Sequence, residues 1–184
     1  RLVQIQRGDD ATVAALTKWI SANETRPIFT FLHLYEPHAP YDPPEPFRGA
    51  TENPYDGEIA HVDAIVGEFL EFLKQRNLYN RALIIVFSDH GEGLGDHQED
   101  EHGMLLYRES IQVPLLVKLP NQREKGATVD TPAQLSDIFP TVIEATGSTP
   151  EKSESGALSL LSFLRSPDLE RMVYSETYYP RLHF

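Results

Sequence analysis

Histidines and acidic residues gather in segment 88–103, SDHGEGLGDHQEDEHG. Asp89 and His90 directly follow the apolar, β-branched run ALIIVFS, which is typical of a buried strand. A carboxylate beside an imidazole is a good donor pair for a hard to borderline divalent cation. The glycines that interrupt the segment allow the turns such a loop needs. Because functional groups collect at the carboxyl ends of strands in α/β sheets, we expect Asp89 and His90 to bind a metal.

Several other polar residues are less strongly indicated as metal-binding or catalytic residues. His33 lies inside an apolar run, so we expect a buried, hydrogen-bonded imidazole. His61 lies on the polar side of an amphipathic helix and should be solvated. Asp96 and His97 could either add metal ligands or form an exposed loop tip. Residues 99–101 are three consecutive acids, and such runs usually face water.

Apolar runs of strand length alternate with amphipathic helical segments, which predicts an α/β layered fold. Three helices are expected: one capped by Asp9 or Asp10, one with an apolar stripe from Ile59 to Leu73, and one in SDIFPTVIEATG. Four segments are expected to be strands: IFTFLHLY, LIIVFS, IQVPLLVKLP and RMVYSE.

The first two strands should be neighbouring or near-neighbouring parallel strands, since βαβ crossovers are local and right-handed. The long helix between them should pack on one face of the sheet. The apolar residues expected to be buried there are Ile59, Val62, Val66 and Phe69.

Composition bounds the class of protein. A chain of 184 residues with 40% hydrophobic content can bury one core, so we expect a single domain over 1–184. A net charge of −12, without any Lys/Arg cluster, argues against nucleic acid as a partner. A small anionic ester as substrate would need a bound cation to reverse the local field. No apolar stretch approaches the roughly 20 residues of a membrane helix.

Several hydrolase and nucleotide-binding motifs are absent from the sequence. It contains no G-x-S-x-G, no H-E-x-x-H and no G-x-x-x-x-G-K-[ST]. It also contains no cysteine, which excludes disulfides and thiolate metal sites within this chain. A serine hydrolase of the nucleophile-elbow type and a zincin are thereby excluded.

Five segments in order give the chain a family resemblance: FLHLYEPHAPYDPP, EIAHVDAIVGEFLEFL, IIVFSDHGEGLGDHQEDEHG, VPLLVKLP and LSDIFPTVIEATG. Over nearly its whole length, the chain resembles the sulfatase family of the alkaline phosphatase superfamily. The resemblance implies an α/β fold with a mostly parallel sheet sandwiched by helices. It also implies hydrolysis of sulfate esters, or of phosphate or phosphonate esters in related branches, at one divalent metal.

The resemblance assigns roles to four residues. Asp89 and His90 match the metal-ligand pair, His38 matches a histidine that contacts the substrate, and His102 matches a basic position at the ester oxygens or leaving group. The implied metal is calcium, or manganese, iron or zinc because position 90 is a histidine. The implied nucleophile is a formylglycine made from Cys or Ser, or an unmodified Thr or Ser as in some relatives, and it is expected outside this chain.

The sequence departs from the family by lacking the acidic metal-binding pair and the C/S-x-P-x-R nucleophile motif. We therefore expect a partial sulfatase catalytic domain that lacks the N-terminal half, carries half of an active site and is inactive by itself. Two alternatives remain open. One is a phosphoryl-transfer member of the superfamily, such as a phosphonate or phosphodiester hydrolase or a phosphoglycerol transferase. The other is a non-catalytic sulfatase-like domain.

Overall fold

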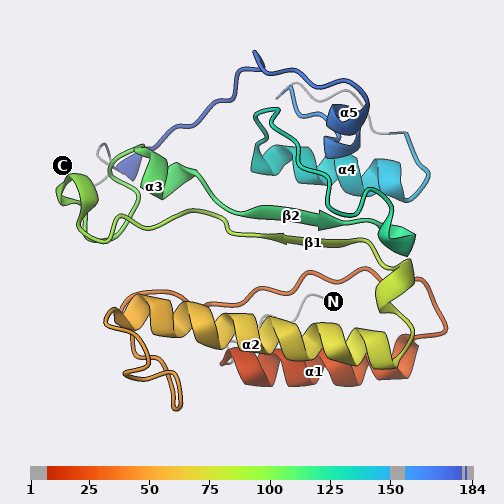
Figure 1. The fold of residues 1–184 in the computed structure, drawn as a ribbon, viewed down its shortest axis with the longest axis horizontal. Helices are drawn as coiled ribbons and strands as arrows, with labels where there is room; N and C mark the ends of the chain where they lie inside the picture. Colours follow the sequence, from red (N-terminus) through yellow and green to blue (C-terminus); the bar gives the residue numbers. More distant parts are fainter. Residues whose placement is uncertain (1–7, 150–155, 180, 182–184) are drawn as a thin grey trace. The chain divides into compact units, whose positions relative to one another are not determined.

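The computed structural model describes residues 8–149, 156–179 and 181, and the chain divides into two compact units (Figure 1). We call residues 1–80 the N-terminal unit and residues 81–184 the C-terminal unit. That the two units belong to a single domain stays a prediction.

Two helices form the core of the N-terminal unit. Helix α1 (Asp9–Asn23) and helix α2 (Pro54–Gln75) lie side by side (Figure 1). Their buried apolar residues are Val13, Ile20, Ile65 and Leu73, joined by Leu78. Both helices were expected, because their apolar residues recur at helical spacing. The expected caps of α1 are wrong: its N-cap is Gly8, while Asp9 is buried and accepts backbone hydrogen bonds from elsewhere in the unit.

Of the four α2 residues expected to be buried, Ile59 is exposed, and Val62, Val66 and Phe69 are half-buried. The capping of α2 follows common rules, since the Asn53 side chain accepts a hydrogen bond from the Tyr55 backbone N–H at 3.0 Å. However, Ile59 is 44% exposed, and Glu58 and His61 are buried instead. Residues 8–80 contain no strand for the apolar stripe to cover. The helix therefore turns its Glu58 and His61 side toward the proline-rich loop that precedes it.

Residues 27–36 form no strand, so the prediction of a strand at IFTFLHLY is wrong. The side chains of Phe29 and Phe31 are 76% and 70% exposed, and His33 is exposed rather than buried. A strand needs a hydrogen-bonded backbone partner, and among the described residues the one sheet consists of two strands from outside this segment. The prediction that it is a neighbouring or near-neighbouring parallel strand of LIIVFS is wrong as well, because it is not a strand.

The C-terminal unit contains two strands at expected places. Strand β1 (Ile84–Phe87) pairs antiparallel with strand β2 (Leu115–Lys118), with Ile84 opposite Lys118 and Phe87 opposite Leu115. The chain between them carries the candidate metal ligands. That connection also contains a 3₁₀ turn, η2 (Asp96–Gln98), and the short helix α3 (Arg108–Ile111).

The rest of the C-terminal unit is helical or extended. Helix α4 (Ile138–Ala145), predicted from SDIFPTVIEATG, contacts helix α5 (Leu160–Arg165). Short 3₁₀ helices complete the element order: η1 (Tyr79–Arg81), η3 (Pro120–Gln122) and η4 (Leu135–Asp137). The prediction of a strand at RMVYSE is wrong, since residues 171–176 belong to no strand in the structure and Met172 is 91% exposed.

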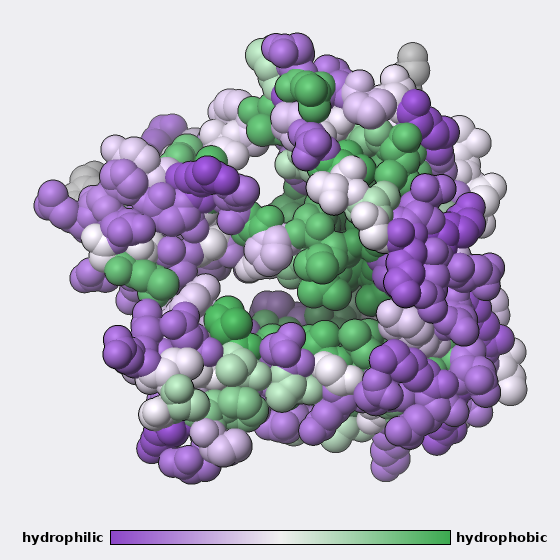
Figure 2. All heavy atoms as spheres, in the orientation of Figure 1, coloured by the Kyte–Doolittle hydropathy of each residue, from purple (hydrophilic) through white to green (hydrophobic). Residues whose placement is uncertain are grey.

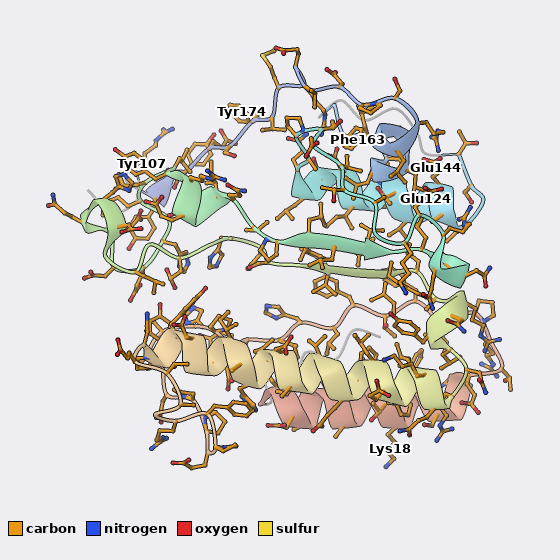
Figure 3. All side chains as sticks on the ribbon, viewed as in Figure 1. Lys18, Tyr107, Glu124, Glu144, Phe163 and Tyr174 are labelled. Carbon is orange, nitrogen blue, oxygen red and sulfur yellow. The ribbon has the colours of Figure 1, made fainter. Side chains whose placement is uncertain are left out.

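A buried ion pair ties this extended C-terminal segment to the helices. Asp137 is fully buried and binds the Arg171 guanidinium through two contacts of 2.8 Å. The guanidinium also lies 5.0 Å from the centre of the Phe163 ring. Phe163 belongs to α5 and is 3% exposed (Figure 3). Segment 166–173 is therefore anchored by its arginine, although it joins no sheet.

Hydrophilic residues make up much of the face drawn in Figure 2, as the net charge of −12 leads one to expect. Hydrophobic residues are also visible between them. Among the residues that the structure describes, none of the helices combines the length and apolar character of a membrane span.

Candidate active site

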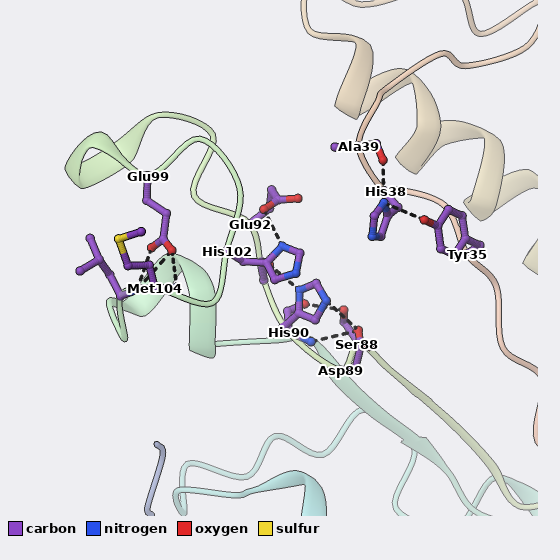
Figure 4. Close-up of polar contacts among 12 residues, drawn as sticks. Tyr35, His38, Ala39, Ser88, Asp89, His90, Glu92, Glu99, His102 and Met104 are labelled. Carbon is purple, nitrogen blue, oxygen red and sulfur yellow. Dashed lines mark hydrogen bonds and ion pairs between the residues drawn. The ribbon is translucent and has the colours of Figure 1, made fainter. Parts of the chain in front are cut away.

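Asp89 and His90 follow the end of β1 and are turned by local hydrogen bonds (Figure 4). The Ser88 hydroxyl donates to the His90 carbonyl oxygen at 2.6 Å, and the His90 N–H donates to Asp89 Oδ1 at 3.1 Å. Both side chains reach solvent, with exposed fractions of 72% for Asp89 and 40% for His90. Ser88 is thus used for backbone structure, whereas the two predicted ligands remain accessible.

The His90 ring is oriented as a metal-binding imidazole requires. Its Nδ1 lies 2.8 Å from the Gly91 carbonyl oxygen. A carbonyl only accepts hydrogen bonds, so Nδ1 carries the proton and Nε2 has the lone pair in the neutral ring. A hydrogen bond from the second ring nitrogen to a carbonyl is the usual support of a metal-ligating histidine.

The separation of the two donor atoms suits a shared cation. His90 Nε2 and Asp89 Oδ1 are 3.7 Å apart. Two donors at about 2.0–2.4 Å from one cation can be separated by such a distance. Among the described residues, however, no cluster of three or more His, Asp or Glu side chains could hold a metal. The pair therefore fits a metal centre but supplies only part of its coordination.

His102 is brought against His90 by the same loop. The two rings stack with centroids 3.7 Å apart and planes at 24°. His102 Nδ1 lies 3.0 Å from Glu92 Oε1, and only 6% of the Glu92 side chain is exposed (Figure 4). A buried carboxylate at Nδ1 holds that proton in place, so any contact with an ester falls to Nε2. The structure thus groups Asp89, His90 and His102.

Two glycines hold this group together through close backbone approach. A Cβ atom on Gly91 would lie 1.9 Å from the Glu109 carbonyl oxygen, and one on Gly93 would lie 2.3 Å from the Glu99 carbonyl oxygen. The Gly91 and Glu92 N–H groups donate to the carbonyl oxygens of Ser110 and Glu109. Gly91 and Gly93 are needed for space rather than for unusual dihedral angles.

The loop tip is more exposed than the group around His90. Asp96 and His97 are exposed, as one of the two expectations had it. His97 Nδ1 hydrogen-bonds the Glu109 carboxylate, and its ring stacks on that of Tyr107 at 3.7 Å. Hydrogen bonds from its own backbone N–H and from His97 hold the pKa of Glu109 below its ordinary value. These side chains organise the tip of the loop.

The three consecutive acids do not behave alike. Asp100 and Glu101 face solvent as expected, but Glu99 is half-buried. Its carboxylate accepts hydrogen bonds from the backbone N–H groups of Met104 at 2.8 Å and Leu105 at 3.2 Å (Figure 4). The expectation for Glu99 is wrong because these amides, five and six residues later, fold back over it.

His38 lies in the proline-rich loop of the N-terminal unit. Its Nδ1 is 2.7 Å from the Ala39 carbonyl oxygen and 3.0 Å from Tyr35 Oη, and its ring stacks on Tyr35 at 4.4 Å (Figure 4). These contacts hold the ring through Nδ1 and through one of its faces. His38 belongs to one unit and the other three residues to the other. That all four converge on one concavity therefore stays a prediction.

Sequence reasoning missed the carboxylates that support the histidines. Glu92 follows His90 by two residues between glycines, a position that could have marked it as an inward-pointing partner. Glu58 precedes Ile65 by seven residues, which puts both on one helical face. His61 shares that face and was wrongly expected to be solvated. It is buried, with Nδ1 2.5 Å from Glu36 Oε2 and Nε2 3.5 Å from Asp10 Oδ2.

Comparison with known proteins gives consistent matches. The model of the family described as Sulfatase matches residues 5–148. An arylsulfatase of Clostridium perfringens is 26% identical over 164 residues, covering 65% of this chain and 34% of the relative. The multifunctional alkaline phosphatase superfamily protein PehA of Trinickia caryophylli is 35% identical over 112 residues, covering 60% of this chain and 21% of the relative.

The fold also matches a solved structure. The phosphonate monoester hydrolase SpPMH of Silicibacter pomeroyi superimposes with a TM-score of 0.73 at 22% identity, covering 91% of this chain and 44% of that structure. The expected α/β, alkaline phosphatase-like fold class is thereby confirmed, as part of a larger fold. The chain spans about a third or less of the length of the two curated relatives.

Proposed function

We infer the function of this chain from one premise, that it belongs to the sulfatase family. We propose that the full-length protein hydrolyses small anionic sulfate esters at one divalent cation. Asp89 and His90 would bind that cation, and His38 and His102 would contact the ester. The observation that carries this proposal is the orientation of His90, whose Nε2 faces Asp89 Oδ1 at 3.7 Å while Nδ1 is bonded to Gly91.

The cation would be calcium, or manganese, iron or zinc, since an imidazole nitrogen suits the latter three. Bound there, it would lower the pKa of the nucleophile and take up negative charge on the transferring group. We propose that the remaining ligands and a formylglycine nucleophile come from outside these 184 residues, which hold no cysteine and no C/S-x-P-x-R motif.

The two histidines would act from Nε2. In each ring Nδ1 faces an acceptor oxygen, Ala39 O for His38 and Glu92 Oε1 for His102. A ring that donates from Nδ1 can donate from Nε2 as well only as an imidazolium. Each histidine would therefore bring a positive charge to the ester, with His102 giving its Nε2 proton to the leaving oxygen and His38 hydrogen-bonding a sulfate oxygen.

The experiment compares two variants of the full-length protein in an aryl sulfate assay with metal analysis. Asp89→Asn removes a charged ligand, so bound metal and turnover should both fall. His38→Ala removes a group that contacts the ester, so turnover should fall while metal content stays at the wild-type level. An equal loss of metal in both variants would show that these roles are assigned wrongly.

A phosphoryl-transfer function is the second candidate. It is supported by the 35% identity to PehA, whose name describes a multifunctional alkaline phosphatase superfamily protein, and by a histidine at position 90. Assaying the full-length protein with an aryl sulfate and an aryl phosphonate monoester separates the two, because the better substrate is the one with the higher kcat/KM. Inertness toward both esters with metal bound would favour a non-catalytic domain.

A further inference from the structure

The loop that carries His38 is held by buried acidic side chains of the two flanking helices. Asp9, in α1, accepts hydrogen bonds from the Tyr35 N–H at 2.9 Å and the Glu36 N–H at 3.1 Å. Glu58, in α2, accepts from the His38 N–H at 3.2 Å and the Asp42 N–H at 2.7 Å. Both ends of segment 35–42 are therefore fastened through backbone amides.

Glu58 has the most direct link to the histidine. Its two carboxylate oxygens are divided between two amides, Oε2 with His38 itself and Oε1 with Asp42. The residue is only 3% exposed. Among residues 8–80, no basic nitrogen lies within ion-pair distance of this carboxylate. Burial of a charge without a cationic partner is costly, so these two amide hydrogen bonds stabilise the group.

The beginning of α2 is shaped to receive this loop. A Cβ atom on Gly57 would lie 2.8 Å from Pro43 Cγ and 3.1 Å from the Phe47 carbonyl oxygen. One turn further along the same face, His61 binds the Glu36 carboxylate at 2.5 Å. Loop and helix therefore meet in close contact on both sides of Glu58, and a change in the Glu58 side chain must move the loop.

We propose that Glu58 is a positioning residue for the reaction, acting through the backbone of His38. This inference rests on the proposed function, because it assumes that His38 contacts the ester. Contacts with Ala39 and Tyr35 set the direction of the imidazole, and Glu58 sets where the loop holds it. A displacement of about 1 Å in such a group can lower a rate about 100-fold.

Glu58→Gln is the informative variant. A glutamine has nearly the same shape but only one acceptor oxygen, so one of the two amides would face an NH₂ group instead. We expect kcat for ester hydrolysis by the full-length protein to fall by about 10- to 100-fold, with metal content unchanged. Glu58→Asp is one methylene shorter, reaches one amide at most, and should lose activity similarly.

A double-mutant cycle with His38→Ala separates positioning from simple destabilisation. If Glu58 acts through His38, Glu58→Gln should lower kcat in the wild-type background but by less than about 2-fold in the His38→Ala background. The control for simple destabilisation is Asp137→Asn in the C-terminal unit, a buried carboxylate that accepts backbone hydrogen bonds from Gln134 and Leu158 and also pairs with Arg171. Its effect on kcat, if any, should be equal in both backgrounds.

The outcomes are distinguishable. Equal losses from Glu58→Gln in both backgrounds, or no loss in either, would overturn the positioning role while leaving the proposed function intact. No effect of His38→Ala, or no hydrolysis of either ester by the wild type, would overturn the proposed function and this inference with it. Hydrogen exchange adds a readout independent of activity: the His38 and Asp42 amides should exchange faster in Glu58→Gln, and unchanged exchange would contradict the geometry.

Discussion

Removal of the Asp137 carboxylate should be among the most destabilising single changes in the C-terminal unit. Asp137 has no exposed surface, and its partner Arg171 has a side chain that is 7% exposed. The carboxylate also accepts from the backbone N–H groups of Gln134 at 2.9 Å and Leu158 at 2.8 Å. Asp137→Ala would break all of these contacts and leave a buried guanidinium without its counter-charge.

The expected cost follows from that geometry. Breaking a buried pair by removing one partner costs about 3–5 kcal/mol, because the other charge stays buried. Domains of this size are stable by about 5–15 kcal/mol in total. With a urea m-value of about 2 kcal/mol/M, the transition midpoint of the affected unit should move down by about 2 M.

The assay is urea unfolding of the full-length protein, combined with hydrogen exchange over residues 156–173 to locate the loss. Glu71→Ala is the control, because its pair with Lys74 is exposed on both sides and should contribute little to stability. If Asp137→Ala shifts the midpoint no more than Glu71→Ala does, the ion pair does not hold the C-terminal segment and the reasoning is refuted.

Three further predictions concern the candidate site and its surroundings. Replacing Asp100 and Glu101 with Asn and Gln should leave turnover of the full-length protein nearly unchanged. Glu99→Gln should instead lower its thermal stability, because Glu99 accepts hydrogen bonds from Met104 and Leu105. Equal melting temperatures of Glu99→Gln and wild type would contradict this. Glu109 has a pKa below its ordinary value, so its stabilising contribution is present above about pH 4.5 and is lost as pH falls through the lowered pKa. The difference in unfolding free energy between wild type and Glu109→Gln should therefore be larger at pH 6 than at pH 3, and a constant difference would refute the assignment. Finally, the 184-residue chain alone should bind manganese and calcium weakly and cleave neither aryl sulfates nor aryl phosphates. The reason is that one carboxylate and one imidazole leave most of the coordination shell to water. Metal-dependent turnover that Asp89→Asn abolishes would show that the chain holds a complete site.

Helices and strands with a strong local pattern were predictable from sequence. Helix α2 has apolar residues at steps of three and four, and β1 is a short β-branched run. The apolar run at 28–35 has the same local signature as β1, yet it forms no strand. A run of apolar and β-branched residues indicates that a segment fits a buried sheet, but a strand forms only where a second backbone can hydrogen-bond to it.

The positions of Asp89 and His90 in the fold were predictable from sequence, whereas the side chains that support the histidines were not. Asp89 and His90 stand at a strand end within a distinctive motif, so their placement could be read along the chain. The partners of His61 come from residues 36 and 10, and the amides bound by Glu58 lie 16 and 20 residues before it. Such pairings depend on how the proline-rich loop folds back on α2, which no local periodicity encodes.

The hydrogen bonds in the connection between β1 and β2 form a nested series, which has a consequence for folding and for variation among relatives. From the inside outward, the N–H groups of Gly95, Gly93 and Gly91 reach the carbonyl oxygens of Glu99, Glu101 and Ser110, and the strand pairing closes the series. Each inner ring shortens the chain that the next must close, so the hairpin can zip from its tip toward the strands at a small entropic cost per step. Residues inserted at 96–98 would lie inside the Gly95–Glu99 ring, so the hydrogen bonds of Gly93 and Gly91 to Glu101 and Ser110 need not change. The tip is therefore where length can change with least disturbance to the register that places Asp89 and His90.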